Sequence, residues 1–222
     1  MSRFFVILLV ASTLAACATS RSQIRAPAPA AGSAIAAPGS GPAVQIGDVV
    51  DARVFEERPP HPSTPSLGWG GAGAASAEER ARAVGRKRNT YGRALGDVLL
   101  EPGESVADLV REHLAAALRQ AGYRVIDAPA DDPAAIRIDV RIDRFWTWFQ
   151  PGFWQVRLHG EITTQLSFRG RGDAIGIDVS EVDARQAAHD RAWRQILDQA
   201  LAAWRAAVVA RAPSFPVPPD PS

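Results

Sequence analysis

The chain has 222 residues and a formal net charge of +1, because 25 lysines and arginines nearly balance 24 aspartates and glutamates. This length suits one domain with a substantial core plus tails. The near-neutral charge supplies no global basic field, and we therefore expect no nucleic-acid partner.

The first 17 residues have the pattern of an export signal. Arg3 is followed by an apolar run from Phe4 to Ala11, which is too short to cross a bilayer core of ~30 Å as a permanent helix. The following Leu14-Ala-Ala-Cys17 resembles the lipobox of bacterial lipoproteins. In a lipobox the cysteine sulfur receives a diacylglycerol and the new N-terminus a third acyl chain such as palmitate, and multiple chains make anchoring stable.

This resemblance implies a membrane location through Cys17, the only cysteine of the chain, which has no intrachain disulfide partner. Ala18 follows it in place of an aspartate. By the retention rule known for enterobacterial lipoproteins, that favours the periplasmic face of the outer membrane of a Gram-negative bacterium.

Composition divides the chain into four parts. We expect a signal peptide over residues 1–16 and a lipidated cysteine with a disordered Ala/Pro/Gly/Ser tether over 17–42. A single domain should cover 43–211, followed by a disordered Pro-rich tail over 212–222.

The first part of the domain reads as extended chain and loop. Apolar residues on one parity predict a strand from Val44 to Phe55, and Glu56 to Arg88 is a long irregular segment that ends in the basic Arg86-Lys87-Arg88. Loops this long in compact domains are functional or disordered. Ser76 with Glu79 has capping-box spacing for a short helix, and Tyr91 to Leu100 is a further extended piece.

Two amphipathic helices are predicted, from Pro102 to Ala121 and from about Asp183 to Ala210. Ser105 with Asp108 forms an N-terminal cap for the first helix, and Gly122 is its left-handed stop. The expected buried stripe of the second helix is Ala188, Ala192, Trp193, Ile196, Leu197, Ala200, Leu201, Trp204 and Val208.

The segment between the helices predicts a long β-hairpin whose tip, Phe145 to Trp154, has six aromatic residues in ten. Apolar residues occupy even positions on both sides, so opposed residues should have an even sum. A three-residue loop, Gln150 to Gly152, would satisfy this and would pair Asp143 with His159 and Phe149 with Phe153. Arg144 then falls on the apolar face, which a bulge near the tip would correct.

These elements predict an α+β fold, in which an antiparallel sheet of about four to five strands with a long central hairpin carries two amphipathic helices on one face. A final strand through Ile175, Ile177 and Val179 completes the sheet, with its apolar residues on odd positions.

The predicted register divides the aromatic tip between the two faces. Trp146, Trp148 and Trp154 fall on the core face, and Phe145, Phe149 and Phe153 fall on the polar face. Three exposed phenylalanines would form an apolar patch of the kind that marks a protein-partner or membrane contact. The alternative is that the long 56–88 loop covers them, and the sequence leaves both open.

No catalytic, cofactor or metal site is predicted. Asp139, Asp143, His159 and Glu161 would cluster on the polar face of the hairpin, but their cross-strand charges explain them as structural pairs on an open face. The four histidines lack metal-ligand spacing, and no nucleophile elbow occurs. We therefore expect a protein that is not an enzyme.

Several short motifs, in their order and spacing, resemble the YajG-like family of bacterial outer-membrane lipoproteins. They are Asp51-Ala-Arg53, Arg88-Asn-Thr-Tyr-Gly92 with Gly96-Asp-Val98, the helix ending in Ala-Gly-Tyr123, and Phe149-x-Pro-Gly-Phe-Trp154. The resemblance implies a periplasm-facing lipoprotein with no known activity or cofactor and no established role. The expected function is a non-enzymatic binding module for an envelope protein partner. The alternative, by fold-level analogy, is an auxiliary lipoprotein of an envelope lipid or solute ABC transport system.

Overall fold

The computed structural model describes residues 21–29, 41–68, 71–89, 93–127, 135–152, 155–170, 172–185 and 190–216. The signal peptide, Cys17, Phe153 and Trp154 lie outside these ranges. No helix in the described ranges is long and apolar enough to span a membrane.

The strands, in chain order, are β1 (Ser22–Ile24), β2 (Ala43–Asp51), β3 (Ala83–Arg88), β4 (Ala94–Leu100), β5 (Arg124–Ile126), β6 (Ile136–Pro151), β7 (Val156–Phe168) and β8 (Ala174–Arg185). The helices are α2 (Ala77–Arg82), α3 (Val106–Gln120) and α4 (Asp190–Arg211), with 3₁₀ turns η1 (Ala72–Ala74) and η3 (Ala212–Ser214).

Within the described ranges, eight strands form one mixed sheet. β6, β7 and β8 are an antiparallel meander, whereas β2 runs parallel to the first half of β6 and β3 runs parallel to its end. β4 pairs with β3 in antiparallel fashion, and β1 and β5 pair in parallel with β4 and β2. The α+β class is confirmed. The expected antiparallel sheet of four to five strands is wrong, because the parallel partners of β6 come from distant segments.

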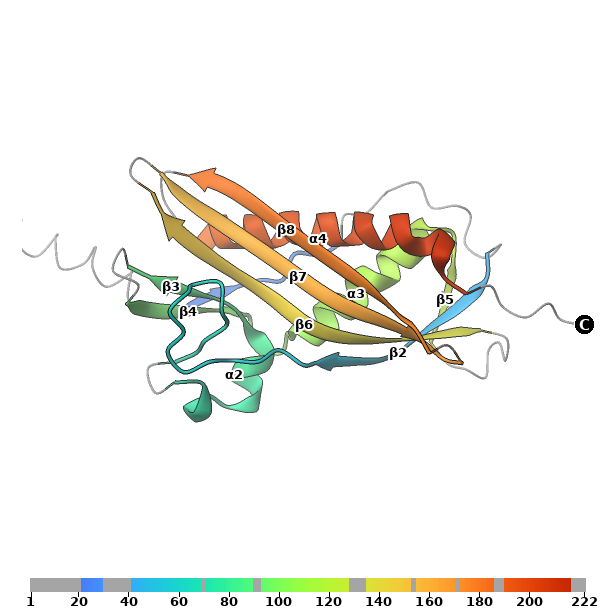
Figure 1. Ribbon diagram of the computed structural model, residues 1–222, viewed down its shortest axis with the longest axis horizontal. Coiled ribbons are helices and arrows are strands. Elements are labelled where there is room, and N and C mark those ends of the chain that lie inside the picture. Colours follow the sequence, from blue (N-terminus) through green and yellow to red (C-terminus); the bar gives the residue numbers. More distant parts are fainter. Residues whose placement is uncertain are drawn as a thin grey trace, which may run out of the picture.

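The main core lies between the sheet and the two longer helices, α3 and α4, which cover one face (Figure 1). The predicted helices are confirmed in their essentials. Ser105 accepts a hydrogen bond from the Asp108 N–H, and Gly122 ends α3 with a φ of +93°. The α4 stripe is buried as expected from Ala192 to Val208, and Ala188 of the expected stripe lies outside the described residues. The helix begins at Asp190 and not at the expected Asp183, which belongs to β8.

A smaller core lies on the opposite face of the sheet, beside α2. It contains Trp146 and Trp148 of β6, together with Leu67, Ala75, Ala83 and Leu99. β3 approaches β6 closely here. A Cβ on Gly85 would lie 2.5 Å from the Thr147 hydroxyl oxygen, so a larger residue would push the two strands apart.

A β-bulge at Asp143 explains how one strand serves both cores. Ile142 pairs with Thr164 and Arg144 with Thr163, so Asp143 is the extra residue. The bulge is therefore confirmed, but the predicted pairs are wrong. His159 faces Trp148 and not Asp143, and Phe149 faces Leu158. The extra residue moves each later side chain to the other face, which puts Phe145 in the main core.

Both ends of the domain extend beyond the expected limits of 43 and 211. β1 lies within the expected 17–42 tether, and it is not disordered, because Ser22 and Ile24 are buried against β4 and α4. At the C-terminal end, Phe215 is buried and packs on Phe168 with ring centroids 5.0 Å apart. These segments contain few apolar residues, and each is ordered by contacts with the main core.

Candidate functional site

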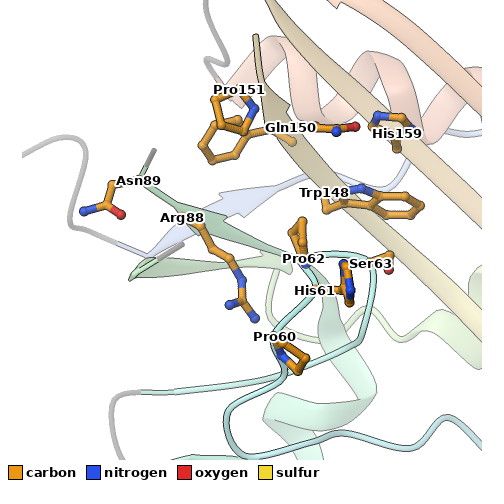
Figure 2. A pocket seen from close by; sticks show the side chains of 11 residues that line it. Pro60, His61, Pro62, Ser63, Arg88, Asn89, Trp148, Gln150, Pro151 and His159 are labelled. Atoms are coloured by element: carbon orange, nitrogen blue, oxygen red, sulfur yellow. The ribbon is translucent and has the colours of Figure 1, made fainter. Parts of the chain in front are cut away.

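A cleft of about 440 Å³ opens where the β6–β7 hairpin tip meets the end of β3 (Figure 2). One wall comes from the hairpin and the other from the 60–63 loop, with the end of β3 between them. The lining residues are Pro60, His61, Pro62, Ser63, Arg88, Asn89, Trp148, Phe149, Gln150, Pro151 and His159.

The hairpin wall is built on a stacked pair, Trp148 and His159. Their rings lie 4.8 Å apart at an interplanar angle of 5°, because the two residues are directly opposed in the register. Burial lowers the pKa of His159 below its usual 6.5, although Glu161 raises it, and Arg157 lowers it further. The ring is therefore neutral at neutral pH. Its Nε2 atom is buried and has no hydrogen-bond partner among the described residues.

The opposite wall is held in place by two side chains of the sheet. The Trp146 indole N–H donates to the Pro62 carbonyl oxygen at 3.1 Å, and the Arg88 guanidinium donates to the Pro59 carbonyl oxygen at 3.2 Å and to Ser66 Oγ at 3.1 Å. Phe55 packs edge-on against Trp146, with ring centroids 6.1 Å apart. The loop is thus fixed against the sheet, which gives the cleft a defined shape.

The charge of the cleft is positive. Arg88 is its one charged lining residue among those described, and no carboxylate lines it. Burial, and secondarily the neighbouring Arg86, lower the pKa of Arg88. Arg86 lies deeper, where its guanidinium is 3.7 Å from the buried Asp97 carboxylate and donates to the Gly68 carbonyl oxygen. Two guanidinium groups thus lie in and behind the cleft wall.

The three phenylalanines that were expected to form one exposed patch do not do so among the described residues. Phe145 is fully buried in the main core and cannot be an exposed contact. Phe149 is partly buried against that core and also lines the cleft, and Phe153 lies outside the described residues. The 56–88 segment does cover aromatic side chains, but they are Trp146 and Trp148, because the bulge exchanges the faces.

The acid–base candidates are not brought together. Asp143 lies in the bulge, where it accepts a hydrogen bond from Arg141 at 2.7 Å, and it does not line the cleft that contains His159. Glu161 pairs with Arg144. No group of three or more His, Cys, Asp or Glu side chains that could hold a metal ion occurs within the described ranges.

A second hollow of about 350 Å³ lies at the far end of the sheet, where the β7–β8 turn meets the end of α4. Phe168, Asp173 and Arg211 contribute to it. Its lining thus combines an aromatic ring with charges of both signs.

The sequence indicates some of the residues that line the cleft and not others. The Pro-Pro-His-Pro run at 59–62 lies in a loop that is unusually long for a compact domain, and such loops carry function. Arg88 belongs to the basic run Arg86-Lys87-Arg88, but the sequence placed this run in an irregular loop, and Asn89 gives no comparable signal. In the structure the run ends β3, with Arg86 buried and Arg88 half-buried.

No protein-family model matches the sequence, and no curated protein does. Among solved structures, one described only as an uncharacterized protein is 13% identical, with a TM-score of 0.45, over 87% of this chain and 98% of its own. Protein XCC0632 from Xanthomonas campestris, of family model DUF330, is 11% identical with a TM-score of 0.44, over 88% of this chain and 97% of its own. A putative neuraminyllactose-binding hemagglutinin homolog from Helicobacter pylori is 18% identical with a TM-score of 0.29, over 47% and 72%. These comparisons do not confirm the YajG-like resemblance.

Proposed function

We propose that this chain is a lipid-anchored, periplasm-facing lipoprotein of the bacterial outer membrane whose domain is a non-enzymatic binding module. The cleft at the hairpin tip is the binding surface. The observation that carries this proposal is the pairing of rigid apolar walls, Trp148 against Pro62, with a neutral, half-buried histidine and an arginine. The Leu-Ala-Ala-Cys17 motif supports the anchor.

The lining suggests the chemistry of the ligand. Trp148, Pro60, Pro62 and Pro151 offer flat apolar surface, and the absence of carboxylates from the described lining disfavours a cationic ligand. The buried Nε2 atom of His159 would gain from a hydrogen-bond partner, since an unpaired buried polar atom costs about 1–3 kcal/mol. A partner segment with an apolar body and a neutral or anionic polar group fits these features.

Replacing Cys17 with serine tests the anchor. The variant lacks the thiol that a diacylglycerol would modify, so we expect the protein to move from the membrane fraction to the soluble periplasmic fraction. Fractionation of cells with immunoblotting measures this. Substitution of Ser20 by cysteine in the Cys17→Ser background is a control that restores a thiol without the lipobox. Unchanged membrane association of Cys17→Ser would refute the lipid anchor.

Photo-crosslinking in cells tests the cleft. A photoreactive residue at Gln150, exposed on the cleft rim, should give a discrete adduct, and the same residue at Ser167, exposed on β7 far from the cleft, should not. Ser63→Trp, which fills the cleft without removing a core side chain, should reduce the Gln150 adduct about tenfold or more, equivalent to about 1.4 kcal/mol. Identical adducts from both positions, or no effect of Ser63→Trp, would contradict the assignment of the binding surface.

A further inference from the structure

We propose that the end of the domain that carries the cleft rests directly against an anionic lipid surface, held there by a short N-terminal leader docked on the sheet. The inference rests on the proposed lipid anchor at Cys17. It adds an orientation and a second contact surface to that proposal.

The leader, residues 21–27, is attached to the domain at several independent points. β1 pairs with β4 over the three positions from Ser22↔Val98 to Ile24↔Leu100. Arg21 contacts Asp97 at 3.1 Å and also Glu79, and the Ser22 hydroxyl bonds to Asp190 of α4. Farther along, the Ala26 N–H donates to Glu104 at 3.0 Å, and His113 Nε2 lies 2.9 Å from the Pro27 carbonyl oxygen.

This docking limits the reach of the anchor. Four peptide units separate Cys17 from Arg21, and they span at most about 14 Å when fully extended. A free tether of 25 residues would have a root-mean-square span of about 25–30 Å. A lipidated Cys17 therefore keeps Arg21 close to the headgroup layer, and the domain cannot reorient freely beneath the membrane.

The direction of β1 shows which end of the domain is held there. Because β1 is parallel to β4, the chain before Ser22 enters from the end where β4 begins. β3 finishes at this end, and so does β6, since Gly85 of β3 pairs in parallel with Thr147 of β6. Figure 1 shows β3, β4 and the hairpin tip gathered at one end of the molecule, opposite β5. The cleft opens at the same end.

The charge of this end fits an anionic surface. Arg88 lines the cleft, Arg93 is exposed in the β3–β4 connection, and Arg157 is exposed at the start of β7. The nearby acids have cationic neighbours in the described structure, as Asp190 lies 3.7 Å from Lys87 and Asp183 is 2.6 Å from Arg185. Basic side chains next to a membrane anchor are attracted to anionic lipid headgroups, and the attraction falls off within a Debye length.

Depth-dependent fluorescence quenching tests the orientation with the full lipidated chain in vesicles. Cys17 is the only cysteine and is blocked by lipidation, so a new cysteine can be labelled selectively. The positions are Gln150 at the tip and Ser167 on β7. Arg157, opposite Gln150, is ten residues from Ser167, or about 33 Å along the strand. With headgroup-spin-labelled lipids in phosphatidylglycerol-containing vesicles, we expect most fluorescence to be lost at Gln150 and little at Ser167.

Two further experiments distinguish a wrong orientation from a wrong anchor. A flexible 20-residue Gly/Ser insertion between Cys17 and Arg21 should weaken quenching at Gln150, and so should vesicles of phosphatidylcholine alone. Equal quenching at both positions, or no effect of the insertion, in a vesicle-bound protein would overturn the orientation and leave the anchor intact. Failure of the wild-type chain to bind vesicles, or retention of Cys17→Ser on them, would instead overturn the proposed anchor and this inference with it.

Discussion

Replacing Arg53 with alanine is expected to lower the free energy of unfolding by about 3–5 kcal/mol, the range for removing one partner of a buried charged pair. The side chain is fully buried and joins three parts of the fold. It pairs with Asp51 at 2.6 Å and donates to backbone carbonyl oxygens of Phe145 at 3.1 Å and Arg80 at 2.9 Å, and to that of Ala83. Alanine would remove all of these hydrogen bonds and leave the Asp51 carboxylate without its guanidinium partner.

Denaturant unfolding of the domain measures this change. Arg25→Ala is the matched control, because Arg25 pairs with Glu101 at 3.2 Å but is 70% exposed, and exposed pairs contribute about 0–1 kcal/mol. A loss below about 1 kcal/mol for Arg53→Ala would show that the sheet does not depend on this arginine to join β6, β3 and α2.

Acidification from pH 6.5 to 4 is expected to destabilise the domain by up to about 3 kcal/mol through His113. The side chain is fully buried on α3, and burial lowers its pKa to about 4. Its Nδ1 lies 2.9 Å from the Arg205 guanidinium on α4 and its Nε2 contacts Pro27, so the neutral ring accepts from Arg205 and donates to the carbonyl oxygen. Asp198 on α4 raises the pKa and Arg205 lowers it, both less than burial does.

The domain loses stability on acidification because the unfolded chain binds a proton at His113 at a higher pH than the folded chain does. The unfolded histidine has a pKa of about 6.5, so between pH 6.5 and 4 the unfolded chain binds the extra proton and gains stability relative to the folded one. The contribution of His113 to the free energy of unfolding is therefore fully present above pH 6.5 and is lost as the pH falls toward 4. Below pH 4, His113 causes no further change in the free energy of unfolding. Unfolding midpoints across this range measure it. His113→Gln should flatten the profile above pH 5, and an unchanged slope in that variant would assign the effect to other groups.

Local features of the fold were predictable, because each depends on residues close in sequence. The Ser105 and Ser76 caps, the left-handed Gly122 and the buried α4 stripe are all present. The odd apolar parity of β8 is also present, with Ile177 buried. Pairing between distant segments was not predictable from the same reasoning. β1 has three residues, and nothing in Ser-Gln-Ile indicates a parallel partner 76 positions later.

The register of the hairpin shows how one extra residue in a strand changes a site prediction. Even apolar positions on both strands can be reconciled either by an odd loop or by a bulge, and period-two counting does not distinguish them. The position of Arg144 on the apolar face pointed to the bulge. Because it lies at Asp143, the described tip residues exchange faces, so Phe145 becomes core and Trp148 becomes the cleft wall. The predicted tip does line the cleft, but through Trp148 and Phe149 and not through Phe145.

The docked leader also shortens the exposed edge of the sheet. β4 ends in the apolar run Val98-Leu99-Leu100, and its outer edge would present unpaired backbone groups of the kind that template strand addition between molecules. β1 covers those same three residues. Within the described sheet β1 becomes the edge strand in place of β4, and its three residues offer less backbone for strand addition than the seven residues of β4.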